Sequence, residues 1–183
     1  MALYQTVEDR NNPDEVEANA PFYCNEKNAW LGMGYYFWDT FIQNAHWWGS
    51  WKYKNGYVIV EFTCKPKFTK SCFDLHGNME QVQYFNEIID YLKQQNLCSD
   101  KTTVAVVIEF LKKTTDFLSR FNSIRAYGHN SKSNMDIIPF VCGGRHFLDL
   151  TPAVQVCVFE KNSEILSEGK IVHPTNYVAG YLA

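Results

Sequence analysis

The run of glycines and aromatics from residue 32 to 37 (GMGYYF) is the stretch of this sequence best suited to chemistry. Glycine lets the backbone take positive φ or lie close to a bound molecule. Side chains alternate along an extended chain, so Tyr36 points away from Tyr35 and Phe37. We therefore expect one tyrosine ring to face a cleft while its neighbours fill the core. The alternative, that all three rings are core, stays open.

The pattern G-x-G-x-Y-F over residues 32–37, with a small residue at Ala45 and aromatics at 47–48, resembles the central motif of the diphtheria-toxin-like ADP-ribosyltransferases. This superfamily includes the poly(ADP-ribose) polymerases. Two outer segments resemble the family's other motifs. Residues 3–6 (LYQT) are similar to its opening strand, and residues 154–159 (VQVCVF) to the late strand that begins with a catalytic Glu.

The resemblance implies an α+β protein, with an ADP-ribosyltransferase-like split, mixed β-sheet fold, flanking helices and a cleft for NAD as substrate. The nicotinamide–ribose bond would break through an oxocarbenium-like transition state, and ADP-ribose would pass to a nucleophile or to water. Tyr36 would stack on the nicotinamide ring, a contact worth roughly 0.5–1.5 kcal/mol beyond area burial. The implied catalytic residues are Tyr36 and Gln155, and the implied NAD-binding residues are Tyr4, Gln5, Thr6, Gly34 and Tyr36.

Two departures from the family pattern limit the implied reaction. The first motif has no His, and the aligned position is Tyr4 or Gln5. Gln155 stands where the family has Glu, so the site lacks a charge that would supply about 4 kcal/mol at 4 Å and an effective dielectric near 20. This argues against chain elongation and favours mono-ADP-ribosyl transfer to a macromolecular target, or hydrolysis of NAD. The alternative is a catalytically silent module of the same fold that binds a nucleotide or a protein partner.

Further charged residues offer weaker candidates. Asp149 and Glu160 lie near the third motif and could replace its missing carboxylate, although a turn cap and a solvated strand end are the simpler interpretations. Arg145 and His146 follow two glycines and could meet a diphosphate, because arginine pairs bidentately with phosphate oxygens. Arg125 is an equal or weaker candidate for that role.

Composition narrows the class of protein. The 183 residues are 46% hydrophobic and 20% charged, which predicts a single folded domain over residues 1–183. A net charge of −3 argues against wrapping of duplex DNA. No apolar run reaches the roughly 18–20 residues of a membrane span, and the N-terminus has no signal-peptide pattern. Six cysteines without a C-x-x-C pair predict a reduced, cytoplasmic protein with no metal.

The partners that the resemblance implies are NAD and an acceptor, a protein or a nucleic acid, that the sequence does not identify. A small stand-alone domain of this kind resembles bacterial or phage toxins, effectors and defence proteins, a placement made by analogy alone.

The elements that must position these residues follow from periodicity and turn signals. Helices are predicted over 40–48, capped by Asp39 and ended by Gly49, over 78–95 and over 102–121. Strands are predicted over 2–7, 57–62, 124–127, 137–141 and 153–159, with loops over 8–20 and 128–134. Because strands outnumber helices and do not alternate with them regularly, the pattern is typical of the α+β class.

Overall fold

The computed structural model of the chain describes residues 1–128, 137–144 and 146–178. The strands in these residues are β1 (Ala2–Glu8), β2 (Tyr35–Asp39), β3 (Tyr57–Thr63), β4 (Cys72–Asp74), β5 (Ser123–Tyr127), β6 (Ile137–Pro139), β7 (Phe147–Asp149), β8 (Val154–Val158) and β9 (Lys170–His173). Seven of them form one sheet in the order β4-β5-β8-β2-β1-β3-β9. Its strand pairs are antiparallel except for the parallel pair β4 and β5.

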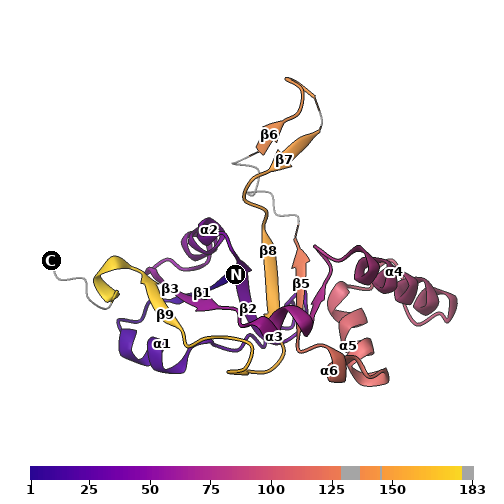
Figure 1. The fold of residues 1–183 in the computed structure, drawn as a ribbon, viewed down its shortest axis with the longest axis horizontal. Coiled ribbons are helices and arrows are strands. Elements are labelled where there is room, and N and C mark those ends of the chain that lie inside the picture. Colours follow the sequence, from indigo (N-terminus) through magenta and orange to yellow (C-terminus); the bar gives the residue numbers. More distant parts are fainter. Residues whose placement is uncertain (129–136, 145, 179–183) are drawn as a thin grey trace.

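Helices cover both faces of this sheet (Figure 1). They are α1 (Pro13–Asn19), α2 (Ile42–Lys52), α3 (Pro66–Lys70), α4 (Met79–Gln94), α5 (Val104–Thr114), α6 (Phe117–Arg120) and the 3-10 helix η2 (Thr175–Tyr177). The protein is thus a mixed α/β structure with a mostly antiparallel sheet, consistent with the predicted α+β class. None of the helices in the described part of the chain is both long and apolar enough to cross a bilayer.

The hydrophobic core is divided between the two faces. On one face, Ile124 and Cys157 pack under α4, α5 and α6, while Trp38 and Ile59 pack under α2. On the other face, a second layer of strand residues packs against Val16 of α1 and against α3. This arrangement leaves α2 and the group α4 to α6 over different halves of one face (Figure 1).

Elements with strong local signals were predicted well. The turn at Gly56, which has a φ of +107°, leads into the β-branched strand β3 as expected. Helix α4 begins after Asn78, whose side chain accepts a hydrogen bond of 3.1 Å from the backbone N–H of Gln81. The local sequence is therefore sufficient to predict both β3 and α4.

Three predictions about helices were wrong. The predicted loop over 8–20 contains α1, which begins at a proline and buries Val16. The predicted helix over 102–121 is two helices, because Thr115 adopts an extended conformation that separates α5 from α6. Helix α2 starts at Ile42 and continues through Gly49, a position where a Cβ would lie 2.4 Å from the ring of Tyr57. Glycine therefore serves close packing there and does not end the helix.

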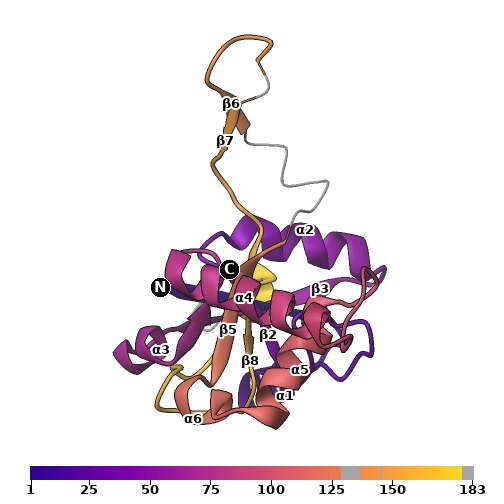
Figure 2. The ribbon, with the colours of Figure 1, turned by 90° about the vertical axis from the view of Figure 1, so that its right-hand side faces the viewer.

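Several elements had no sequence signal that we recognised: α3, β4, β7 and β9. The hairpin formed by β6 and β7 stands apart from the body of the molecule (Figure 2). Its large apolar side chains are exposed to solvent, with Phe140 73% and Val141 69% exposed. This hairpin connects, through the residues before Val154, to β8 in the middle of the sheet.

Candidate functional site

A cleft opens where strands β1 and β2 diverge. The register joins β1 to β2 at two positions, ending at the pair Tyr4 and Trp38, whereas β1 pairs with β3 over its whole length. Beyond Tyr4 the two strands separate, and residues 22–30 lie against the gap. The resulting cleft has a volume of about 350 Å³.

The walls of the cleft come from five parts of the chain. Strands β1, β2 and β8 supply the floor, while residues 22–30 and the end of α2 supply the sides. The lining is rich in aromatic rings, among them those of Trp30, Trp38 and Trp48. A volume in this range and an aromatic lining with a few polar groups are typical of small-molecule sites.

Strand register brings the three predicted motifs side by side. Tyr4 of β1 pairs with Trp38 of β2, and Trp38 pairs in turn with Gln155 of β8. Directly paired residues of antiparallel strands point to the same face of the sheet. Tyr36 lies two residues before Trp38 and therefore shares this face, so Tyr36 and Gln155 both line the cleft.

The Tyr36 hydroxyl is engaged by the backbone just before β2. It accepts a hydrogen bond of 2.8 Å from the N–H of Leu31 and donates one of 2.8 Å to the carbonyl of Gly32. Burial raises the pKa of Tyr36 above its usual range, so the hydroxyl stays protonated. Tyr36 also packs against the core cluster under α4, α5 and α6. Its hydroxyl orders the turn that precedes β2, so any contact of this side chain with a bound molecule would involve the ring.

Gln155 is held by a tryptophan from the opposite wall. The indole N–H of Trp30 donates to Gln155 Oε1 at 2.5 Å. Because an indole N–H is only a donor, the partner must be the amide oxygen, which settles the orientation of the amide. Within the described residues, no acceptor is found for the NH₂ group of Gln155. Its two N–H donors are therefore the groups that this side chain presents for binding.

Gln5 and Thr6 line the cleft, but their polar atoms serve the fold. The Gln5 amide donates to the carbonyl of Phe22 at 3.0 Å and accepts from the N–H of Phe22 at 2.6 Å. The Thr6 hydroxyl donates to the carbonyl of Ala45 at 3.0 Å. These two residues thus attach the 22–30 segment and α2 to β1.

Tyr4 and Gly34 lie next to the cleft without lining it. Tyr4 is 9% exposed and packs with Trp38 in the core under α2. A Cβ on Gly34 would lie 2.5 Å from the sulfur of Cys157, so glycine permits the close approach of the chain to β8. Burial raises the pKa of Cys157 to about 12, and this thiol is therefore protonated at neutral pH.

One ion pair lies at the edge of the cleft. The Nζ of Lys52, the last residue of α2, is 3.3 Å from Oε1 of Glu26 in the 22–30 segment. Both residues line the cleft, and they are the charged side chains among its described lining residues. The same Nζ lies 5.8 Å from the centre of a Trp48 ring.

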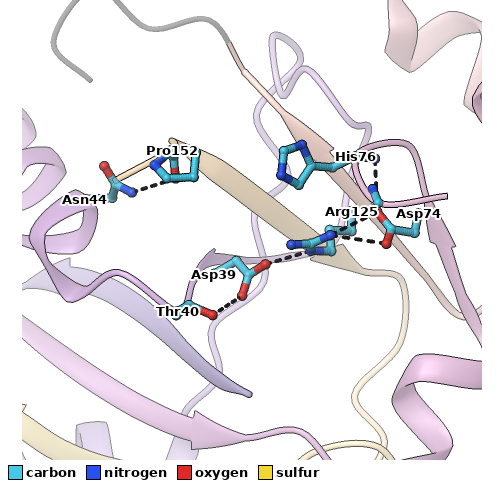
Figure 3. Close-up of polar contacts among 8 residues, drawn as sticks. Asp39, Thr40, Asn44, Asp74, His76, Arg125 and Pro152 are labelled. Atoms are coloured by element: carbon cyan, nitrogen blue, oxygen red, sulfur yellow. Dashed lines mark hydrogen bonds and ion pairs between the residues drawn. The ribbon is translucent and has the colours of Figure 1, made fainter. Parts of the chain in front are cut away.

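A second charged group, outside the cleft, connects three strands (Figure 3). Arg125 of β5 donates from Nε to Asp39 of β2 at 2.6 Å and from Nη1 to both oxygens of Asp74 of β4 at 3.1 Å. Asp39 is 2% exposed and also accepts from the hydroxyl of Thr40. Arg125, a sequence candidate for a diphosphate, is therefore neutralised by two carboxylates, and Asp39 binds Arg125 where a helix cap was predicted.

The other charged candidates also lie away from the cleft. Asp149 accepts from the Tyr127 hydroxyl at 3.2 Å and from the backbone N–H of Thr151 at 3.0 Å. Glu160 is exposed beyond the end of β8, and His146 is exposed in the hairpin. Arg145 lies outside the described residues.

Sequence reasoning missed four residues that complete the cleft: Glu26, Trp30, Trp38 and Lys52. Trp48 belongs to the aromatic pair at 47–48 in the central motif, and the high aromatic content, 16%, was the signal that could have pointed to the other two tryptophans. No family model, no curated protein and no solved structure matches this chain. The chemistry of the cleft is therefore the basis for a functional argument.

Proposed function

We propose that this protein is an NAD-dependent mono-ADP-ribosyltransferase that modifies a macromolecular target. The observation that carries the proposal is the meeting of the three motifs. Their strands β1, β2 and β8 are neighbours in the sheet, and Tyr36 and Gln155 line one cleft where β1 and β2 separate. The divergence of these strands supports a sheet of the split kind that the family resemblance implies.

In this proposal the aromatic lining binds nicotinamide and Gln155 binds the ribose. The Tyr36 ring stacks on the pyridinium, and the NH₂ of Gln155 donates to a ribose hydroxyl. The bond between the nicotinamide nitrogen and the ribose carbon breaks, and its electron pair leaves with nicotinamide. The acceptor then forms a bond to the same carbon and loses its proton.

The amide at position 155 favours transfer of a single unit. It orients the sugar without placing negative charge beside the developing cation, and it cannot take a proton from an incoming hydroxyl. The one carboxylate among the described lining residues is Glu26, which lies at the rim in its pair with Lys52. The acceptor must therefore be intrinsically nucleophilic or be activated by its own neighbours.

Release of nicotinamide from NAD tests the proposal. The wild-type protein is incubated with NAD, alone and with cell extract as a source of acceptor, and free nicotinamide is followed by chromatography. We expect release that depends on the protein. Absence of release with every extract would exclude the transferase.

The Gln155→Glu variant sharpens this test. A carboxylate at 155 can still accept from the Trp30 indole, so the local structure is preserved while a negative charge is added. We expect NAD cleavage to rise at least about tenfold, which needs about 1.4 kcal/mol of the roughly 4 kcal/mol available to such a charge. An unchanged rate would place Gln155 away from the reacting sugar. Gln155→Ala is the matched control, because alanine has neither the hydrogen-bonding amide nor the added negative charge.

A silent nucleotide-binding module is the second candidate. The observation that favours it is the engagement of Gln5 and Thr6 with backbone groups of the protein, so two of the residues expected to bind NAD are occupied by contacts within the fold. Such a module would bind ADP-ribose and release no nicotinamide from NAD with any extract.

A further inference from the structure

The ion pair at the rim joins two separate walls of the cleft. Lys52 ends α2, and Glu26 belongs to the 22–30 segment that closes the gap between β1 and β2. Their side chains are 36% and 56% exposed, and their charged atoms are 3.3 Å apart. The pair therefore lies where a molecule entering the cleft would meet it.

This pair is suited to exchange of partners. Ion pairs with this degree of exposure contribute only about 0–1 kcal/mol to stability, so separating the charges costs little. Glu26, more than half exposed, can return to water. Arg125 offers a contrast, because it is held by two carboxylates, one of them 3% exposed. Lys52 is thus the cation of the described cleft lining that a ligand can recruit.

The neighbouring groups indicate which ligand would recruit it. The cleft offers aromatic rings for stacking and the amide donors of Gln155, and Lys52 adds one ammonium group. An ammonium group binds phosphate as a point charge. A molecule that combines flat rings, sugar hydroxyls and phosphate charge, such as a dinucleotide, would use all three.

We propose that Lys52 binds the diphosphate of a dinucleotide. Before the ligand arrives, Glu26 holds Lys52 at the rim, and the diphosphate then replaces Glu26 as the partner of Lys52. The naming of a dinucleotide rests on the proposed function. The Lys52 ammonium lies 5.8 Å from the centre of a Trp48 ring, and its long flexible stem lets it change partner by movement of the side chain alone. Removal of Lys52 and removal of Glu26 should therefore have opposite effects on affinity.

Binding of ADP-ribose to the full chain, measured by titration calorimetry, tests this proposal. We expect Lys52→Ala to weaken binding about tenfold and to reduce its dependence on salt, because one phosphate contact is lost. Glu26→Gln frees Lys52 and should tighten binding severalfold. Lys67→Ala and Glu164→Gln are matched controls, since this exposed pair lies away from the cleft. Neither control should change affinity.

The outcomes separate this inference from the proposed function. If both rim variants lower the melting temperature and neither shifts the dissociation constant, the pair is structural and the inference is wrong, even where NAD is cleaved. If both variants weaken binding, the exchange of partners is wrong. Binding that depends on Lys52 without release of nicotinamide keeps the diphosphate site and excludes the transferase. Failure of the wild-type protein to bind ADP-ribose overturns this inference, whereas the transferase is decided by release of nicotinamide from NAD.

Discussion

Tyr36 shows how one side chain combines two separable tasks. Tyr36 lines the cleft and packs against the core under α4 to α6, while its hydroxyl binds the backbone of Leu31 and Gly32. The motif pattern predicted that the ring faces a cleft. The hydroxyl contacts could not be predicted, because they depend on the turn at Gly32, which has a φ of +86°. Substitutions can therefore test the ring and the hydroxyl independently.

We expect Tyr36→Phe to lower stability while keeping NAD binding. Loss of the hydroxyl leaves the Leu31 N–H and the Gly32 carbonyl without this partner, at a cost of about 1–3 kcal/mol. The ring that stacks on nicotinamide remains. Tyr36→Leu removes the ring as well and should also lose affinity for NAD. Chemical denaturation and calorimetric titration of both variants measure the two effects, and equal NAD affinity in both would contradict the stacking role.

At the scale of the element, Arg125 connects strands that are far apart in the sequence. Its guanidinium links β5 to β2, across the intervening β8, and to the neighbouring β4 (Figure 3). Asp39 was predicted to cap a helix from its position before residues 40–48. The real partner of Asp39 lies 86 residues away, a distance at which local patterns carry no information. This long-range contact explains why the start of α2 was predicted wrongly.

Loss of the Asp39 charge should destabilise the sheet. In Asp39→Asn the partly buried Arg125 loses its closest anion, and removal of one partner from a fully buried pair costs about 3–5 kcal/mol. Because Asp74 still contacts Arg125, we expect Asp39→Asn to lower the free energy of unfolding by an amount at or somewhat below the lower end of that range. The exposed pair of Lys67 and Glu164 provides the control, where Glu164→Gln should cause no measurable change. Equal melting temperatures for Asp39→Asn and wild type would show that the network is dispensable.

Asp74 makes part of this stability depend on pH. Burial opposes ionisation of Asp74, but hydrogen bonds from Gly77 and His76 and the charge of Arg125 outweigh it and lower the pKa of Asp74. A carboxyl whose pKa is lower in the folded state contributes stability that is present above its unfolded pKa, about 3.9, and is lost as the pH falls through the folded value. We therefore expect Asp74→Asn to be less stable than wild type at pH 7. The two proteins should converge in urea unfolding below about pH 4, and a gap that widened there would contradict this.

At the scale of the whole molecule, the sequence allowed prediction of the parts and not of their assembly. The meeting of the three motifs at one cleft was expected only through the family resemblance, and the pairing of β1 with β2 and of β2 with β8 was not predicted. The cleft depends on the separation of β1 from β2 and on the position of residues 22–30, to which no periodicity points. Trp30 reaches Gln155 across 125 residues of sequence, so neither residue alone indicates the other.

The hairpin of β6 and β7 should be independent of the folded body. Phe140 and Val141 are 73% and 69% exposed and belong to none of the described core clusters. We expect Phe140→Ser with Val141→Ser to change the free energy of unfolding by no more than about 0.5 kcal/mol. Retention on a hydrophobic interaction column should fall. A clear loss of stability would show that the hairpin packs against the body in solution (Figure 2).

The contact between Gln5 and Phe22 has a consequence for how tightly any ligand can bind. Its two hydrogen bonds fasten the wall of the cleft to a central strand before a ligand arrives. Such preorganisation spares the ligand the entropic cost of ordering that wall, so more of the contact energy appears as affinity. A ligand that enters the cleft therefore meets a preorganised wall on the side of β1 and a mobile side chain, that of Lys52, at the rim.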